Sequence, residues 1–334
     1  MRPSHLAALA ALALAAPVYF ADALETAPVG TSVGDTPTYS FRSAGLDGGG
    51  VKSLADLRGK PVLVDFWGVK CPPCVGFAVP KGVEMQRKYG DDLQVIFVES
   101  QGHTAEQVER LAYQRGWMGS NAIWTLERPF DVGLNGIPHF ALLDCDGKII
   151  LQGYSQELHS QLEELVAQQV ALVQKGPKDL PKELKGAWKA SSKGEYAAAI
   201  QEARAAEAKG VAGVPAFVQR VESMANARLR RIEWLIEDGR ADLAADDAQA
   251  LAKATQGLEG IGEKATELAA RLASAEMKAE IEAAKQLGKL KDALVADKLD
   301  SKGMDKKLAK LAEKHTGTHA ARRAQQLMSL VAAG

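Results

Sequence analysis

The sequence is short of cysteine, of aromatic residues and of net charge. Its 334 residues hold three cysteines, too few for a scaffold of this size that is stapled by disulfides. The net charge of −1 provides no overall field that would attract nucleic acid or an acidic substrate. Aromatic residues make up only 6% of the chain, which suits a large alanine-rich helical part. The length predicts two or three domains.

Long apolar runs are also scarce, and the one candidate for a membrane segment lies at the N-terminus. Arg2 and His5 precede the apolar stretch 6–20, and the small residues of Ala21-Asp22-Ala23 follow it. This order is typical of a secretory signal peptide, and we predict cleavage after Ala23. The run is shorter than the ~20 residues that span a bilayer, but an uncleaved membrane anchor stays open as the alternative. We therefore predict export to the periplasm or another extracytoplasmic compartment.

Export changes how the cysteines are interpreted, because one closely spaced pair in an exported protein indicates redox chemistry. Cys71 and Cys74 follow the β-branched and apolar run Val62–Phe66, which predicts a strand buried on both faces. The run breaks at Gly68. Two cysteines separated by two residues, directly after a buried strand, are typical of a thioredoxin-like active site.

The residues around this pair resemble a known family. The segment Ser53–Lys60, the strand Val62–Trp67 and the Cys-Pro-Pro-Cys motif are similar to the redoxin, TlpA/ResA-like branch of the thioredoxin superfamily. A second landmark, Gly136-Ile137-Pro138, resembles the family segment that carries a cis-proline facing the active site. The resemblance covers residues 37–175. It implies a thioredoxin-like α/β fold, with a central mixed sheet flanked by helices.

Thiol–disulfide exchange needs one thiolate that attacks and a second thiol that resolves the mixed disulfide. A helix that begins at Cys71 would lower the pKa of this thiol, so we predict Cys71 as the exposed nucleophile and Cys74 as the buried resolving thiol. Pro72 and Pro73 fit the first helical turn, where backbone donors have no partner inside the helix. Lys70 places a cation beside Cys71 that acts in the same direction, or it simply points into solvent.

The resemblance also implies roles for residues outside the motif. Asp65 matches a buried acid that relays a proton to the resolving cysteine, and a strand-end carboxylate in solvent is the alternative. Trp67 matches the tryptophan that shields the site. Pro138 should be cis, and Ile137 should offer its backbone to a substrate. His139 either lies near the site or is a surface histidine.

Two positions depart from the family pattern. Lys70 stands where the family often has a tryptophan, which leaves the substrate preference open. Pro80 lies six residues after Cys74 instead of five, which leaves the register of the next helix open. We predict a helix from Cys74 to about Tyr89 that Pro80 kinks.

Two other interpretations of the cysteine pair remain: half of a zinc site and a purely structural disulfide. Zinc usually takes four ligands, and only Cys145 and scattered histidines could complete the set. So short a loop between Cys71 and Cys74 would constrain the unfolded chain little. Cys145 is expected in a hairpin turn, as a free thiol or in an intermolecular disulfide. We predict no metal and no cofactor beyond the redox-active Cys71–Cys74 pair.

From Gly176 onward the composition changes to Ala, Lys, Glu and Leu without strand signals. A similar stretch begins at Gly194 and again at Gly239, and a fainter third start lies at Gly288. The pattern weakly resembles tetratricopeptide-type repeats, and it predicts an all-α domain of stacked helix pairs. The predicted boundaries are 1–23 for the signal peptide, 24–36 for a linker, 37–175 for the thioredoxin-like domain, 176–182 for a second linker and 183–334 for the helical repeats.

Together these features predict an exported thiol–disulfide oxidoreductase that reduces disulfides of specific partner proteins and is served by an upstream redox partner. One alternative is a scaffold whose helical array binds a protein partner as its main function. Another is a peroxiredoxin-like peroxidase, although the site lacks the Pro-x-x-x-Thr-x-x-Cys motif of that group. No nucleic acid is expected as a partner, and a membrane only if the N-terminal segment stays uncleaved.

Overall fold

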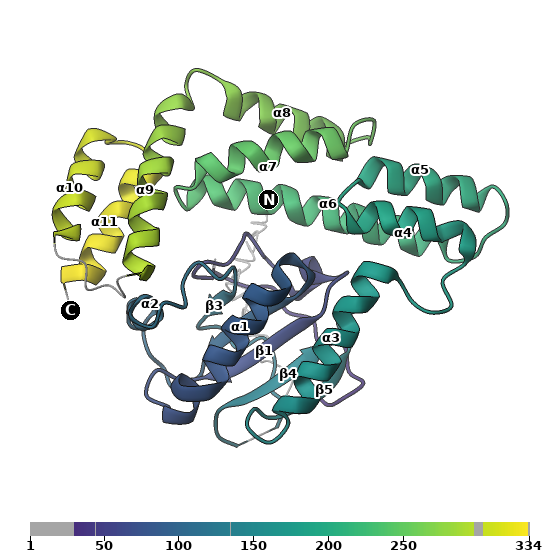
Figure 1. Cartoon of the computed structure of the whole chain (residues 1–334), viewed down its shortest axis with the longest axis horizontal. Coiled ribbons are helices and arrows are strands. Elements are labelled where there is room, and N and C mark those ends of the chain that lie inside the picture. Colours follow the sequence, from purple (N-terminus) through teal and green to yellow (C-terminus); the bar gives the residue numbers. More distant parts are fainter. Residues whose placement is uncertain (1–29, 44, 134, 297–302, 333–334) are drawn as a thin grey trace, which may run out of the picture.

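The structure is a computed structural model that describes residues 30–43, 45–133, 135–296 and 303–332. An α/β domain comes first, and a run of helices follows it and arches over it (Figure 1). This architecture confirms the predicted fold class, a central mixed sheet flanked by helices and then an all-helical remainder. The predicted signal peptide, 1–23, lies outside the described residues.

Five strands form one mixed sheet in the order β3-β2-β1-β4-β5. The central strand β1 is parallel to β2 and antiparallel to β4, and all of its residues are buried. Its continuous apolar run suits a strand that is covered on both faces. The strands are β1 (Val62–Trp67), β2 (Gln94–Glu99), β3 (Ile123–Thr125), β4 (His139–Leu143) and β5 (Ile149–Tyr154).

The two faces of the sheet are covered by different kinds of structure. One face packs against α1 (Val79–Tyr89) and α3 (His159–Lys175), and α2 (Ala105–Gln114) belongs to the same apolar cluster. The other face is covered by the short 3-10 turn η1 (Leu54–Leu57) and by irregular chain that includes Phe130. Because side chains alternate along a strand, β1 contributes to both cores.

One extra residue separates Cys74 from the proline in α1, and a π-turn absorbs it. Helical backbone begins at Pro72, and the turn Cys74–Ala78 is π-helical, with the Val79 N–H bonded to the Cys74 carbonyl oxygen. A π-turn holds one residue more than an α-turn, which accounts for the shifted spacing. Pro80 therefore falls in the first turn of α1, where a missing N–H is tolerated, and the helix runs to Tyr89 as predicted.

Most helices of the helical part pack on the next helix along the chain. Its helices are η4 (Lys182–Leu184), α4 (Lys185–Ser192), α5 (Tyr196–Glu207), α6 (Val214–Glu237), α7 (Ala241–Ala254), α8 (Ile261–Ala273), α9 (Lys278–Ala296), α10 (Met304–Lys314) and α11 (His319–Ala332). Two predicted repeat starts are confirmed, because Gly194 and Gly239 each take a φ of 75° just before a new helix, a conformation that favours glycine. The third is wrong: Gly288 lies inside α9.

The helical part packs along its inner side onto the α/β domain. α4 contacts α3, α6 contacts η1, and both α9 and α11 contact α2. Apolar residues of α9 to α11 belong to the same core cluster as Val108 and Trp117 of the α/β domain. The inner face of the arch is therefore occupied by the chain's own α/β domain (Figure 1).

Part of the predicted linker 24–36 is bound to the α/β domain. The Thr31 N–H donates to the Asp131 carbonyl oxygen at 2.9 Å, and the Ile149 N–H donates to the Asp35 carbonyl oxygen at 2.9 Å. The described chain is thus attached to the fold from Thr31 onward. Within the described ranges, no helix is both long and apolar enough to cross a bilayer.

Candidate active site

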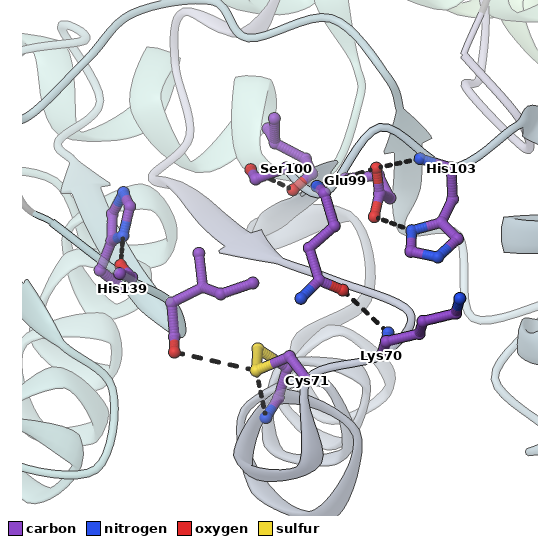
Figure 2. Close-up of a disulfide and its surroundings, with 11 residues drawn as sticks. Lys70, Cys71, Glu99, Ser100, His103 and His139 are labelled. Carbon is purple, nitrogen blue, oxygen red and sulfur yellow. Dashed lines mark hydrogen bonds and ion pairs between the residues drawn. A yellow bond between two sulfur atoms is a disulfide. The ribbon is translucent and has the colours of Figure 1, made fainter.

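The Cys71–Cys74 disulfide lies where the chain leaves β1 and enters the first helix (Figure 2). Cys71 directly precedes the helix, and its Sγ accepts the backbone N–H of Cys74 at 3.2 Å. This is the N-cap position, where an acceptor meets the unpaired amides of the first turn. Pro72 and Pro73 occupy the next two positions, where the absence of an N–H breaks no helical hydrogen bond.

Access to the two sulfurs is restricted. Cys74 is fully buried, as the sequence predicted, and Cys71 is only 5% exposed. Cys71 is therefore not the openly exposed residue that we expected, because in the disulfide form it belongs to the apolar core that includes Trp67. Of the two residues only Cys71 has exposed surface, so a partner can approach the pair only at Cys71.

The loop before β4 brings a backbone carbonyl to the disulfide. The peptide bond between Ile137 and Pro138 is cis, as expected from the Gly-Ile-Pro segment. The Ile137 carbonyl oxygen lies 3.8 Å from Cys71 Sγ (Figure 2). A disulfide sulfur carries no proton, so this contact is a close approach and not a hydrogen bond. An extended chain that reached Cys71 would meet the backbone of the half-buried Ile137.

Asp65 is a carboxyl group buried in the same core as the two cysteines. Its side chain is 3% exposed and projects from the face of β1 that also carries Leu63 and Trp67. Burial raises the pKa of Asp65 to about 7. Its Oδ1 makes no hydrogen bond to any residue that the structure describes. A solvent-exposed position is thereby excluded, and the group can hold or release a proton near neutral pH.

Trp67 lies inside the domain, not over the sulfurs. It is fully buried and makes edge-to-face contacts with Trp117 and Trp124, with ring centroids 6.2 Å and 5.5 Å away. Trp117 and Trp124 stack on each other. Trp67 can therefore shield the site only from the inside, as part of a packed aromatic cluster that the sequence did not predict.

A second loop, Glu99–His103, supports the loop that carries Cys71, and the sequence analysis missed it. The buried Glu99 carboxylate accepts the backbone N–H groups of Gln101, Gly102 and His103 at 3.1, 2.9 and 3.0 Å. It also contacts His103 Nδ1 at 2.9 Å (Figure 2). An acid that ends an apolar strand, just before Ser-Gln-Gly, was the available signal.

Gln101 connects the two loops. Its Oε1 accepts the backbone N–H of Lys70 at 2.9 Å, and a Cβ added to Gly68 would lie 2.3 Å from the Gln101 side chain. The exposed Lys70 side chain extends away from the disulfide toward His103 (Figure 2). There it lines a groove of about 490 Å³ beside α2. The Lys70 backbone thus connects the disulfide loop to Gln101, and its cationic side chain lines the groove.

His139 and Cys145 lie apart from the disulfide. His139 is 1% exposed and stacks on Phe66, on the face of the sheet opposite to that of the cysteines. A surface position is therefore excluded for this ring, and burial lowers its pKa. Cys145 is a free, half-buried thiol in the turn between β4 and β5, as predicted, and burial raises its pKa to about 11.

Known proteins resemble this chain over part of its length. A stretch of 111 residues, 33% of the chain, is 31% identical to the thiol-disulfide oxidoreductase ResA of Bacillus anthracis. The α/β domain has a thioredoxin-like fold, with the disulfide directly after its central strand. A stretch of 107 residues, 31% of the chain, is 33% identical to thioredoxin Y, chloroplastic, of Oryza sativa subsp. japonica.

The likeness to these relatives is partial. The chain covers 64% of ResA and 62% of thioredoxin Y, less than two thirds of either. A solved thiol:disulfide interchange protein of Chlorobium tepidum TLS matches 42% of this chain and 99% of its own, at 22% identity and a TM-score of 0.32. No protein-family model matches the chain.

The thioredoxin-like domain therefore combines a disulfide at a helix N-terminus, a buried acid of raised pKa and a backbone acceptor beside Cys71. Such a disulfide can be opened by attack at Cys71, with the Cys74 sulfur leaving as the thiolate, and the helix N-terminus can stabilise a thiolate on Cys71 once the pair is reduced. In the part of the chain that the structure describes, no three or more His, Cys, Asp or Glu side chains group as metal ligands would.

Proposed function

We propose that this protein is a thiol–disulfide oxidoreductase that cycles Cys71 and Cys74 between dithiol and disulfide. The observation that carries the proposal is the position of Cys71 at the helix N-cap, with the Cys74 amide 3.2 Å from its sulfur. Once the disulfide is reduced, this amide and the helix dipole favour a thiolate on Cys71. Cys71 is therefore the attacking sulfur, and the fully buried Cys74 is the resolving one.

In the reducing direction, the Cys71 thiolate attacks one sulfur of a partner's disulfide, and the partner's other sulfur leaves as a thiolate. Asp65, with a pKa of about 7, accepts the proton of the Cys74 thiol. The Cys74 thiolate then attacks Cys71 Sγ, and the partner's first sulfur leaves with the bonding electron pair. The Cys71–Cys74 disulfide forms, and an upstream dithiol protein returns two electrons and resets the pair.

The substrates that fit this site are specific proteins, not every accessible disulfide. With only 5% of Cys71 exposed, a partner must present an extended chain that fits the opening. The backbone of Ile137 and the groove lined by Lys70 offer contacts on either side of the sulfur. The composition of residues 2–23 supports an extracytoplasmic location. The helical array supports the thioredoxin-like domain from its inner side, so a protein partner of the array would bind its outer side.

The assignment of the two sulfurs is tested by trapping. Cys74→Ser keeps the attacking thiol and removes the resolving one, so mixed disulfides should accumulate through Cys71. Cys71→Ser is the matched control and should trap nothing. Complexes that form only through Cys74 would reverse the assignment, and none with either variant would refute disulfide exchange with proteins.

The direction of electron flow is tested by the reduction potential of the Cys71–Cys74 pair, titrated against glutathione or a stronger dithiol. A value near about −270 mV supports a reductant that is supplied with electrons from outside its compartment. A value near about −120 mV would make the protein an oxidant that donates disulfides, contrary to the direction proposed here.

A further inference from the structure

A cavity of about 450 Å³ lies between the thioredoxin-like domain and the first helices of the helical part. Its apolar walls come from the helical part and include Leu180, Leu184, Trp188 and Phe217. Sites for small molecules are usually cavities of roughly 300–1,000 Å³ with apolar walls and a few well-placed polar groups. The size and the lining of this cavity therefore fit a small ligand.

Two guanidinium groups line this cavity, and neither forms an ion pair with any residue that the structure describes. Arg220 lies over the Trp188 ring, 4.4 Å from its centroid, and donates a hydrogen bond to the Gly59 carbonyl oxygen at 2.9 Å. The Nη1 atom of Arg58 is buried and makes no hydrogen bond to any described residue. Burial lowers the pKa of Arg220, which is the response of a desolvated cation.

Two carboxylates also line the cavity, and the charge of Asp146 acts against the effect of burial on the pKa of Arg220 without an ion-pair contact. Asp146 and Asp179 are exposed, and neither forms an ion pair with Arg58 or Arg220 in the described part of the chain. Buried charges in proteins are normally paired with an opposite charge. Two guanidinium groups that form no ion pair with a described residue, at one apolar cavity, are therefore matched to an anion that also has an apolar part.

We propose that this cavity binds a small monocarboxylate with an apolar body. The carboxylate lies between Arg58 and Arg220, because a guanidinium group can donate two parallel hydrogen bonds to a carboxylate. The apolar body packs against Trp188 and Phe217, where each buried methylene group adds to the affinity. A carboxylate without this body, such as acetate, binds much more weakly.

The site is spatially separate from the disulfide. Gly59 precedes β1, and Cys145 follows β4, whose Leu143 pairs with Val62 at the first residue of β1. The disulfide follows the opposite end of β1. Ligand binding therefore does not depend on the proposed redox function, and the two can fail independently.

Cys145 supplies a direct probe of the cavity. It lines the cavity wall and is the free cysteine when Cys71 and Cys74 are oxidised. The rate at which a thiol reagent labels Cys145 in the oxidised, full-length protein is measured with increasing decanoate, below its micelle concentration. We expect saturable protection by decanoate, with a matching dissociation constant from calorimetry, and none by acetate at the same concentration.

The chemical class of the ligand is tested with decan-1-ol, which has the same chain without the charge. Equal protection by decanol and decanoate would mean a purely apolar site and would overturn the proposal. So would the absence of both protection and binding heat with decanoate. The disulfide-free double variant Cys71→Ser with Cys74→Ser should bind decanoate as the parent does.

Variants locate the site. Arg220→Met keeps the packing on Trp188 but removes the charge, and it should weaken decanoate binding at least about tenfold, the scale of one lost charged hydrogen bond. Arg231→Met on the same helix is the control, because Arg231 pairs with Asp91 outside the cavity and its loss should leave the affinity unchanged. Ala216→Trp, at an exposed position of α6 that lines the cavity, should block binding without disturbing a core. Unchanged affinity in Arg220→Met and in Ala216→Trp would refute the site.

Discussion

Arg230 in α6 donates a hydrogen bond from Nη2 to Oδ1 of Asp56 at 2.7 Å, across 174 positions of sequence. The other oxygen of Asp56 accepts the backbone N–H groups of Lys52 and Ser53 at 2.9 Å and 3.0 Å. One carboxylate thus organises the start of η1 and ties the helical array to the thioredoxin-like domain. The contact lies at the end of the sheet away from the disulfide, so the array can brace the domain without covering Cys71.

Removal of this contact should cost stability. Arg230→Met is expected to lower the free energy of unfolding by about 1–3 kcal/mol, because the side chains are only 26% and 17% exposed and Asp56 would lose a charged donor. Arg231→Met, on the next residue, breaks an ion pair whose Asp91 is 78% exposed, and the expected loss is under ~1 kcal/mol. Urea unfolding of both variants measures the difference. Equal losses would show that the Arg230–Asp56 pair contributes no more than a surface contact.

Truncation after residue 175 should destabilise the thioredoxin-like domain. It removes apolar residues of α9 to α11, among them Leu287, Leu294 and Leu327, that share a core cluster with Val108 and Trp117. We expect a loss of more than ~3 kcal/mol, since several buried side chains lose their packing partners. Thermal unfolding of residues 30–175 beside the full chain measures it. A fragment as stable as the parent would show that the array adds no stability to this domain.

The free energy of unfolding of Asp65→Asn should rise relative to that of the parent as the pH increases from acid to neutral. Between the unfolded pKa near 3.8 and the folded value of about 7, the folded parent holds a proton that the unfolded chain has released. The parent's free energy of unfolding therefore falls as pH rises through this window and levels off above it. The variant lacks this fall, so the difference between the two should grow by up to about 4 kcal/mol from pH 4 to pH 8.

The same substitution should slow the resolving step, because the Cys74 thiol loses its proton acceptor. Mixed disulfides between Cys71 and a partner should live longer in Asp65→Asn, and the effect should be greatest near neutral pH. Denaturation curves at several pH values, together with quench-flow of the mixed disulfide, measure both effects. A parallel pH dependence in variant and parent would remove Asp65 from the mechanism.

Glu99→Gln should loosen the loop that supports Cys71. In the variant, the oxygen that accepts three backbone N–H groups either remains as the amide oxygen or is replaced by the NH2 group. The negative charge is lost in both cases. We expect a loss of about 1–3 kcal/mol in stability and faster reduction of the disulfide by a small dithiol, because Gln101 holds the Lys70 amide less firmly. Glu106→Gln on exposed α2 surface is the control. Reduction kinetics equal to the parent's would confine Glu99 to a local role.

Much of the site was predictable because its chemistry is local in sequence. The run from Val62 and the spacing of Cys71 and Cys74 predict a buried strand that leads into a helix, and neighbouring backbone atoms alone build the N-cap. The roles of Glu99 and Gln101 were not predictable. Gln101 binds the Lys70 backbone across 31 positions of sequence, and the course of its loop depends on where β2 ends. The altered spacing of Cys74 and Pro80 indicated an irregular helix register, but it did not predict a π-turn.

Periodicity and the spacing of neighbouring residues were enough to predict the α/β pattern, the Cys71–Cys74 pair and the change to helices at Gly176. The burial of Cys71, the core around Asp65 and the direction of the Trp67 side chain became known only from the folded chain. The tertiary structure alone showed that the helical array folds back over its own domain and encloses the Arg58–Arg220 cavity. The physical reason is that burial and electrostatics depend on which distant segments meet, and a pattern of residue types along one segment does not specify its partner.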